Sequence, residues 1–305
     1  MTPPELGAHR DVAEWWGSNP MTYGRGRHGG TKYHNEKGAA EFVERGSARF
    51  FELADRQFYA WNTDLHTPEA PFGRVFDYER FRDKSVLEVG CGMGCMASNW
   101  ARRGARMTAV DLSSTGVEQT RRRFELSGLP GRILRMDGSQ LALSDDTFDF
   151  AYSWGVLHHF PATQRAIDEI WRVLKPGAPV GVMLYHRNSL RHLYRILYLE
   201  GFLHFERRFL SPLQLASRYG DGAREEGNPH TWPVTSREAH DVLFSRFEDV
   251  RTTVLPGEGV LRVFDYCLPK FGTRMLPQFI AAPFIRRWGW SLLITGRKPS
   301  SAAAC

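Results

Sequence analysis

The feature that most constrains the fold of this 305-residue chain is an alternation of strand-like and helix-like segments between residues 85 and 185. Short apolar runs, typical of buried strands, are separated by segments whose apolar residues recur at helical spacing. The expected strands are 86–89, 107–110, 133–136, 148–152 and 180–185, joined later by 250–255 and 290–295, and the expected helices are 97–103, 116–126 and 166–174. Because strands that alternate with helices form right-handed β-α-β units, we predict an α/β domain on a mostly parallel sheet.

The segments outside this alternation are predicted additions to one core domain. Residues 1–49 are rich in glycine and polar groups, so we predict a flexible N-terminal arm that either closes over the site as a lid or stays disordered. Apolar residues at helical spacing in 190–198 fit a cap on the domain, a membrane-surface helix or a dimer contact. The predicted organisation is a helical segment at 50–84, a core domain at 85–298 with cap inserts at about 186–240 and 256–288, and a tail at 299–305.

The composition excludes several classes of protein. With 42% hydrophobic and 24% charged residues, the chain can bury a core and is not disordered as a whole. Its four cysteines are too few for a disulfide scaffold, which favours a reducing compartment and a cytoplasmic location. The longest apolar stretch near the C-terminus, 275–285, has 11 residues, whereas a membrane span needs about 20. A net charge of +6 is weak support for a nucleic-acid partner, and because no cluster of metal ligands is evident we predict no metal.

Ligands of parallel sheets bind where the strands end, so the residues at those ends direct the search for a site. The first signal is the glycine-rich stretch 88–94, since glycines allow a sharp turn and the close approach of a ligand. The second is Asp111, 21 residues after Gly90, whose carboxylate can accept hydrogen bonds from ribose hydroxyls. The third is Asp137, followed by Gly138. The structural alternatives are a tight turn for the glycines, a helix N-cap for Asp111 and a turn for Asp137.

The spacing of the glycines separates two kinds of nucleotide site. A nicotinamide-binding fold needs G-x-G-x-x-G, but Cys95 occupies the position of its last glycine. Five motifs in order instead resemble the class I S-adenosylmethionine-dependent methyltransferases, in particular the Leu-His-His branch of methyltransferase type 11-like proteins. The motifs are 86–94, 110–113, 136–138, 148–159 and 171–177, so the resemblance covers about 85–185. It implies a Rossmann-like fold, with a mostly parallel seven-stranded sheet, an antiparallel last strand and a helical cap insert.

The resemblance also implies which residues bind S-adenosylmethionine, from which S-adenosylhomocysteine is the product. The glycine loop is similar to the one beneath the methionine part of the cofactor, with Glu88 orienting the loop and the amino group. Asp111 is similar to the acid that binds the ribose, and Asp137 to the partner of the adenine amino group. The implied cofactor-binding residues are Glu88, Gly90, Cys91, Gly92, Gly94, Asp111, Leu112, Asp137, Gly138, Ser153 and Trp154.

Residues on the acceptor side leave a weaker signal, because in-line methyl transfer depends on positioning and needs a general base only when the acceptor must lose a proton. Histidines near the strand ends are candidates, since their ordinary pKa is close to neutrality. We therefore predict direct catalytic roles for His158, Tyr185 and His186, with structural, capping or loop roles as the alternative. The predicted substrate-binding residues are Tyr23, His159, Asn228 and His230.

These features predict an enzyme that transfers a methyl group to oxygen, nitrogen or carbon of a small-molecule acceptor in the biosynthesis of a specialised metabolite. The Asn/Asp-Pro-Pro-aromatic motif of amino-methylating nucleic-acid enzymes is absent at Trp154, so we expect no nucleic-acid partner. We expect no membrane partner either and leave a homodimer open. The alternatives are a quinone or lipid methyltransferase at the membrane surface, a protein that binds S-adenosylmethionine without methyl transfer, and a protein or RNA methyltransferase.

Overall fold

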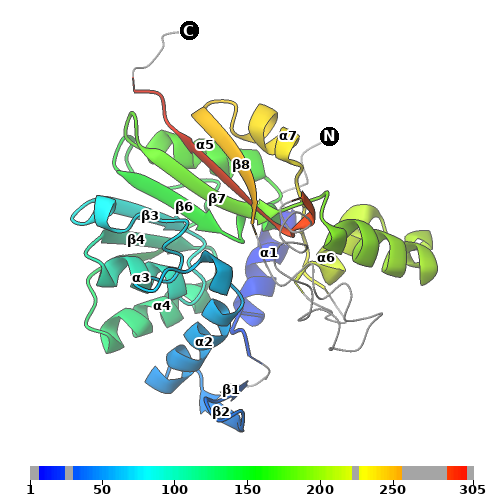
Figure 1. Cartoon of the computed structure of the whole chain (residues 1–305), viewed down its shortest axis with the longest axis horizontal. Helices are drawn as coiled ribbons and strands as arrows, with labels where there is room; N and C mark the ends of the chain where they lie inside the picture. Colours follow the sequence, from blue (N-terminus) through cyan, green and yellow to red (C-terminus); the bar gives the residue numbers. More distant parts are fainter. Residues whose placement is uncertain (1–6, 25–29, 222–226, 256–286, 301–305) are drawn as a thin grey trace.

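The computed structural model describes residues 7–24, 30–221, 227–255 and 287–300. Within these ranges a seven-stranded sheet has the strand order β5-β4-β3-β6-β7-β9-β8 (Figure 1). The strands are β3 (Ser85–Val89), β4 (Arg106–Asp111), β5 (Arg132–Arg135), β6 (Phe150–Trp154), β7 (Pro179–Tyr185), β8 (Glu248–Leu255) and β9 (Ser291–Arg297). The first five are parallel, and β9 lies antiparallel between β7 and β8. The predicted mostly parallel sheet with an antiparallel last strand is confirmed.

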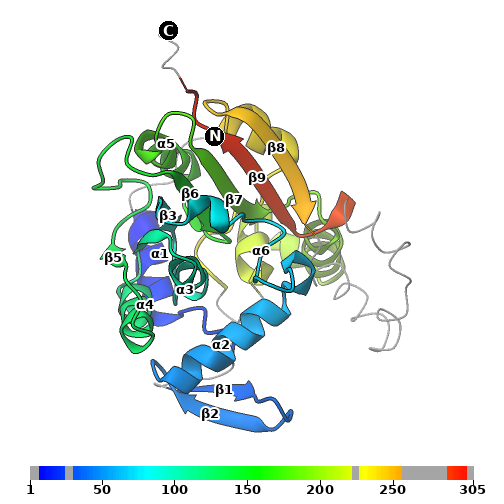
Figure 2. The ribbon, with the colours of Figure 1, turned by 60° about the vertical axis from the view of Figure 1, so that its left-hand side comes forward.

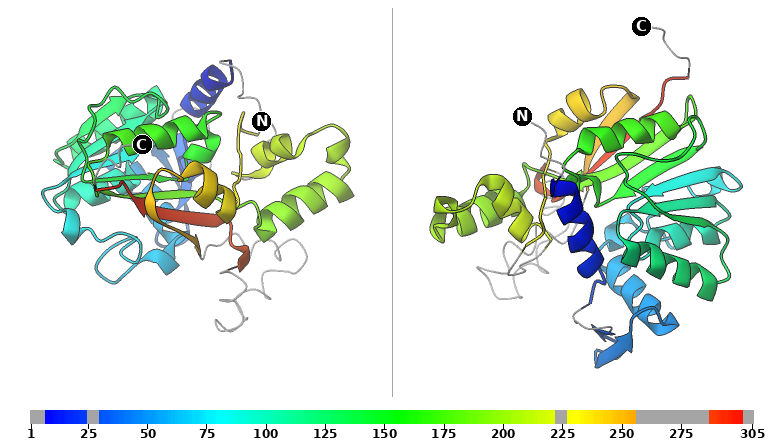
Figure 3. Two further views of the ribbon diagram at one scale, coloured as in Figure 1. Left: turned by 90° about the horizontal axis from the view of Figure 1, so that it is seen from above. Right: turned by 180° about the vertical axis from the view of Figure 1, so that it is seen from behind.

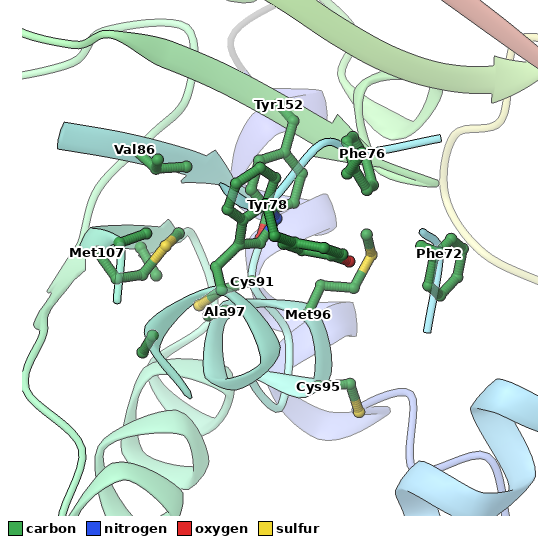
Figure 4. Close-up of a cluster of buried hydrophobic side chains, with 14 of the residues drawn as sticks. Phe72, Phe76, Tyr78, Val86, Cys91, Cys95, Met96, Ala97, Met107 and Tyr152 are labelled. Carbon is green, nitrogen blue, oxygen red and sulfur yellow. The ribbon is translucent and has the colours of Figure 1, made fainter. Parts of the chain in front are cut away.

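Helices and apolar side chains cover both faces of this sheet, as parallel strands require. The side chains of β3 alternate between two cores: Val86 packs with Trp100 of α3, and Leu87 packs with Ile170 of α5. The helices are α3 (Cys95–Arg102), α4 (Ser114–Leu126) and α5 (Thr163–Val173). In Figure 4, Met96 of α3 lies among the aromatic rings of the first core. This double burial explains why the strands appear in the sequence as continuous apolar runs.

The N-terminal residues are more ordered than the sequence analysis predicted. Residues 7–24 and 30–49 of the expected flexible arm form α1 (Gly7–Ser18) and an antiparallel hairpin of β1 (Gly30–His34) and β2 (Ala40–Glu44). In Figure 2 the hairpin lies beside α2 (Ala48–Ala60), at a distance from the sheet. Tyr33 and Val43 are isolated apolar residues in a polar sequence, but they pack together with α2 and Met93. Opening and closing of this segment stays a prediction, and residues 1–6 and 25–29 lie outside the described ranges.

A helical cap follows β7, as predicted. It consists of η4 (Arg191–Leu203), η5 (Glu206–Arg208) and α6 (Pro212–Tyr219), and it projects to one side of the sheet (Figure 3). Ile196 and Leu215 are buried and pack with Trp290, the residue that directly precedes β9. The shorter helical elements are η1 (Thr63–Leu65), η2 (Glu79–Phe81), η3 (Leu157–His159), α7 (Ser236–Glu238) and η6 (Ala239–Leu243). The predicted second insert, 256–288, lies almost wholly outside the described residues.

A buried ion pair fixes α4 against α2. The guanidinium of Arg123 is 1% exposed and bonds the Asp55 carboxylate at 2.7 Å, while its plane lies over the Phe51 ring. Removing either partner would leave a buried charge unpaired, which typically costs about 3–5 kcal/mol. Arg123 also donates to the Sγ atom of Cys95 at 3.5 Å, which links the pair to the start of α3. Among the described residues, no helix has the length and apolarity that crossing a bilayer requires.

Candidate active site

A cavity of about 490 Å³ lies at the carboxyl ends of β3, β4, β6 and β7. Its floor is the loop after β3, and α1 and the segment 20–24 cover one side. Residues from the cap and from the start of β9 complete the wall. The cavity therefore lies where the parallel strands predicted a ligand site.

The glycines after β3 are required by the shape of the backbone. Gly90 and Gly92 have φ angles of 84° and 53°, in the left-handed region that favours glycine. A Cβ atom on Gly90 would lie 2.3 Å from Val156, so any side chain there would collide with a neighbour. A Cβ atom on Gly92 would meet nothing within 4 Å, because Gly92 borders the cavity. The loop thus leaves open space where a ligand can approach the backbone.

Asp111 connects the end of β4 to this loop. Its Oδ2 accepts a hydrogen bond from the Gly92 N–H at 2.7 Å, and its Oδ1 accepts one from the Ser113 N–H at 2.8 Å. Burial raises the pKa of this carboxyl, and the two N–H donors oppose the rise. The N-cap of α4 is Ser113, whose hydroxyl accepts from the Gly116 N–H, so the N-cap alternative does not explain Asp111. Each carboxylate oxygen retains a lone pair for a ligand in the cavity.

Glu88 is a buried carboxyl that faces the same cavity. Its Oε2 atom has no hydrogen-bond partner among the described residues. Burial raises its pKa to about 8, and the Tyr152 hydroxyl opposes the rise. A buried carboxyl oxygen without a partner is costly, so this position favours a ligand that supplies a donor or a positive charge.

Comparisons with known proteins agree with this geometry. Residues 87–181 match a family described as a methyltransferase domain. An uncharacterized methyltransferase of Mycobacterium tuberculosis (strain H37Rv) is 34% identical over 132 residues, which cover 43% of this chain and 64% of that protein. A ubiquinone biosynthesis O-methyltransferase of Hahella chejuensis is 30% identical over 142 residues, covering 44% of this chain and 60% of that protein. The chain thus spans less than two thirds of the length of these curated relatives.

The fold comparison covers more of the chain. The crystal structure of the [4+2]-cyclase SpnF aligns with a TM-score of 0.50 and 20% identity, over 95% of this chain and 96% of that one. Residues 87–181 are thus similar to a methyltransferase domain, as the family resemblance implied. The family match ends at residue 181, so it includes the glycine loop and the strand ends but not the cap.

Three residues that the family resemblance assigned to the cofactor do not line the cavity. The Asp137 Oδ1 atom accepts from the N–H and the hydroxyl of Ser139, at 2.8 and 2.7 Å, and so stabilises its own turn. Ser153 is fully buried, and its hydroxyl donates to the carbonyl of Val89. Gly94 is the third: it is the N-cap of α3, and a Cβ atom there would lie 2.8 Å from the Thr120 side chain. Gly138 and Trp154, next to the first two, do line the cavity, as do Cys91, Leu112 and the unpredicted Met136.

His158 and His186 do not fit the predicted catalytic roles. His158 is fully buried, and its ring packs on that of Tyr185 with 3.8 Å between centroids. Burial also lowers the pKa of His158 well below its ordinary value. His186 is buried too, and its Nδ1 atom lies 3.1 Å from the carbonyl oxygen of Gly289. Neither residue lines the cavity, so both have structural positions.

His159 and Tyr185 do face the cavity, together with Asp221, which the sequence analysis missed. The Tyr185 hydroxyl donates to Asp221 Oδ1 at 2.5 Å, and Asp221 Oδ2 lies 3.5 Å from the Nε2 atom of His159. Asn228 lies behind this group and donates to Asp221 Oδ2 at 2.6 Å. His230 contributes its backbone carbonyl, 2.9 Å from His159 Nδ1. The only sequence signal for Asp221 is its place between two glycines in a polar loop.

Aromatic side chains form much of the rest of the wall. Trp16 of α1 lies against His159, with 5.0 Å between ring centroids, and Tyr23 packs on Phe58 of α2 at 5.0 Å. On the far side Trp290 stacks on Tyr185 at 4.3 Å. Tyr23 was predicted from the sequence, whereas the two tryptophans were not. Aromatic rings therefore line the cavity on several sides, beside the polar groups of the glycine loop and Asp111.

Proposed function

We propose that this protein is an S-adenosylmethionine-dependent methyltransferase that acts on a small-molecule acceptor. One observation carries the proposal: the unpartnered Oε2 of Glu88, the open backbone at Gly92 and the carboxylate of Asp111 border a single cavity. A sulfonium amino acid joined to a nucleoside needs a carboxylate for its ammonium group, N–H groups for its carboxylate and an acceptor for its ribose. Glu88 supplies the carboxylate, the backbone at Gly92 supplies the N–H groups, and Asp111 supplies the acceptor for the ribose.

Different residues bind different parts of the cofactor. Glu88 holds the ammonium group, the loop N–H groups hold the methionine carboxylate, and Asp111 accepts from the ribose hydroxyls. Leu112 and Met136 offer apolar contacts to the adenine. The bound cofactor supplies a methyl group already activated on sulfur. The chain's contribution is to orient the acceptor in line with that methyl group and to exclude water from the cavity.

Calorimetry followed by product analysis tests the proposal. The full chain is titrated with S-adenosylmethionine and S-adenosylhomocysteine and then incubated with labelled cofactor and a panel of small hydroxyl, amine and thiol acceptors. The expected result is binding of both compounds and a product heavier by one CH₂ group. Binding without any methylated product would favour the alternative of a protein that binds the cofactor for another reaction. Absence of binding would overturn the proposal.

The finer expectations belong to the same proposal. A biosynthetic role suits an enzyme whose acceptor pocket is closed by its own cap and α1. The described residues hold no group of three or more His, Cys, Asp or Glu side chains that could bind a metal ion. We assign methyl transfer to positioning and to the acid–base groups of the cavity. The cytoplasmic location and the homodimer stay predictions.

A second candidate function is methyl transfer to a quinone or lipid at a membrane surface. The observation that favours it is the outer face of the cap, where Phe202, Phe205 and Phe209 are exposed, Phe209 to 84%. Arg207 and Arg208 lie in the same stretch and are also exposed. Exposed aromatic rings flanked by arginines suit the interface of an anionic bilayer.

Sedimentation with vesicles decides between the two candidates. Vesicles of phosphatidylglycerol should retain the protein, vesicles of phosphatidylcholine should retain less, and Phe209→Glu should abolish retention. Val242→Glu, at another exposed apolar position on η6, is the matched control and should leave retention unchanged. Equal recovery in the supernatant with and without vesicles would rule out the membrane candidate.

A further inference from the structure

We propose that His159 is the general base for methyl transfer to a phenolic hydroxyl, and that Asp221 is its positioning partner. The inference rests on the proposed function and adds the class of the acceptor. Its basis is a cluster of polar groups in which His159, Tyr185 and Asp221 line the cavity. Asp221 and the cap that carries it lie outside the part of the chain that matches the methyltransferase family.

The surroundings of His159 fix which ring nitrogen carries the proton. Nδ1 lies 2.9 Å from the carbonyl oxygen of His230, and a carbonyl only accepts. Nδ1 also lies 3.0 Å from the Thr231 hydroxyl, whose hydrogen is donated to Asn228 Oδ1 at 2.8 Å. Both neighbours are therefore acceptors, and Nδ1 of the neutral ring holds the hydrogen. Nε2 is left as the basic atom.

Nε2 faces the carboxylate of Asp221 at 3.5 Å, and both residues line the cavity. A lone pair and a carboxylate oxygen repel each other unless a proton lies between them. That proton is either held by the pair itself, as an imidazolium, or brought by a ligand. The hydroxyl group of an acceptor in the cavity would supply this proton, and O-methylation requires that the hydroxyl group lose it.

Asp221 is held firmly enough to orient the histidine. Its two carboxylate oxygens accept from the Tyr185 hydroxyl at 2.5 Å and from the Asn228 amide at 2.6 Å. Tyr185 is itself fixed by stacking between His158 and Trp290. The carboxylate therefore cannot turn away from His159 without breaking two hydrogen bonds. Its negative charge would stabilise the imidazolium that forms when His159 takes a proton.

The chemistry of the wall selects the acceptor. A carboxylic acid is already ionised at neutral pH and needs no base, and Asp221 would repel it. A hydroxyl group must lose its proton, and a phenol loses it far more readily than an alcohol, with a pKa of about 10 for tyrosine. Trp16 lies 5.0 Å from the His159 ring, so a planar aromatic acceptor can stack beside the base. A phenol has both a hydroxyl group that loses its proton readily and a planar aromatic ring.

The step balances in atoms and charge. The O–H bond of the phenol breaks and its proton moves to Nε2 of His159, while the phenolic oxygen forms a bond to the methyl carbon. The bond between that carbon and the sulfonium sulfur breaks, and its electron pair stays on sulfur. The products are a methyl ether, S-adenosylhomocysteine and an imidazolium paired with Asp221. The proton then leaves to solvent when the cavity opens.

The titratable groups in contact with His159 are Asp221 after α6, Tyr185 at the end of β7 and His158 in η3, with His230 contributing its carbonyl. Arg191 of η4 lines the same cavity and donates to the carbonyls of Tyr219 and Gly220. Asp221 provides a negative charge beside the ring. Replacing it with asparagine keeps the shape and removes the charge, so the imidazolium formed during the reaction loses its counter-ion.

Nitrogen NMR of the imidazole tests the pair without an acceptor. In the full-length protein saturated with S-adenosylhomocysteine, the His159 signals are assigned by comparison with His159→Asn. The expected result is a neutral ring protonated at Nδ1. A neutral ring protonated at Nε2 overturns the proposal. His204→Asn, at an exposed histidine of the cap, is the control and should leave the His159 tautomer unchanged.

Methyl transfer to phenols of graded acidity tests the role of the base. With 4-cresol at neutral pH, His159→Asn should lower the turnover rate by about 100-fold or more, the range of general-base catalysis. With 4-nitrophenol, which is already largely ionised in mild alkali, the loss should shrink to less than about tenfold as the pH rises. Equal losses with both phenols, or methylation of amines and thiols but no phenol, overturn the proposal. Failure of cofactor binding in the wild type would instead overturn the proposed function.

Discussion

The carboxylate of Asp111 accepts a hydrogen bond from the backbone N–H of Gly92 at 2.7 Å, so the end of β4 is tied to the loop after β3. Asp111 was predicted to bind the ribose of the cofactor, and Gly92 to lie beneath its methionine part. One hydrogen bond therefore couples the two halves of the proposed cofactor site. Removing the carboxylate should disturb both.

Replacement of Asp111 by alanine should weaken binding of S-adenosylmethionine by roughly 2–4 kcal/mol. Two hydrogen bonds to a charged group contribute about 1.5–3 kcal/mol each, with partial compensation by solvent. Asp137→Ala is the comparison, because its Oδ1 is engaged by Ser139 within its own turn. Asp137→Ala should lower the affinity for S-adenosylmethionine by less than Asp111→Ala does. Isothermal calorimetry measures both, and unchanged affinity in Asp111→Ala would contradict the ribose role.

Gly92→Ala should abolish cofactor binding while the protein stays folded. The new Cβ atom meets nothing within 4 Å, so the folding cost is the strain of a φ of 53°, roughly 1–2 kcal/mol. The methyl group would instead occupy space that the cofactor needs. Gly128→Ala is a matched control, since Gly128 has a φ of 60° and equally open surroundings but does not border the cavity.

Thermal unfolding and calorimetry separate the two effects of these alanines. Both variants should unfold at similarly reduced temperatures, and only Gly92→Ala should lose affinity for S-adenosylmethionine. Equal affinity in the two variants would show that the space at Gly92 is not used by the ligand.

The sequence predicted the sheet well because its strands are buried on both faces. Each appears as a short apolar run, and the β-α-β alternation leaves few ways of ordering them. The glycine loop and Asp111 were found for a similar reason, since their roles depend on local backbone shape. Asp137 and Ser153 show the limit of this reasoning: each follows the expected pattern, but hydrogen bonds to neighbours turn its side chain away from the cavity.

The acceptor side was harder to predict because its groups meet only after folding. His159 and Asp221 belong to different elements, and no spacing along the chain connects them. The pattern Leu-His-His directed attention to His158, although the turn of η3 leaves that ring in the core and exposes the next one to the cavity. The order of α1 and the hairpin was missed because their few apolar residues are scattered and find partners only in tertiary contacts.

Stability of the protein without cofactor should fall as the pH rises from about 4.5 to 8, and Glu88→Gln should remove this dependence. The pKa of Glu88 is raised from 4.5 to about 8, so the folded state holds a proton that the unfolded state has already lost. The stabilisation is complete below the lower value and is lost as the pH approaches the upper one. At about 1.4 kcal/mol per unit, the free energy of unfolding should decrease by at most about 5 kcal/mol.

The same carboxyl should make cofactor binding dependent on pH. The ammonium group of S-adenosylmethionine stabilises the ionised form of Glu88, so binding should release a proton and strengthen as the pH rises toward 8. Calorimetry in two buffers with different ionisation enthalpies counts the proton. The wild type should release close to one near pH 7, and Glu88→Gln should release none. Identical proton release in the two proteins would contradict the assignment of Glu88 to the ammonium group.

Removing α1 should lower turnover more than cofactor affinity. Val12 and Trp16 form one wall of the cavity, and Trp16 contacts the proposed base, His159. The helix is held at its end by the hydroxyls of Ser113 and Thr115, which donate to backbone carbonyls at 3.5 and 2.9 Å. We expect the helix to detach when ligands exchange. Deletion of residues 1–19, or Trp16→Ala alone, should therefore reduce kcat/KM for the acceptor by about tenfold or more, equivalent to ~1.4 kcal/mol of transition-state stabilisation.

The Kd for S-adenosylmethionine, measured on the same samples, should change less than kcat/KM does. Equal turnover of the full and shortened enzymes would contradict a lid at this position.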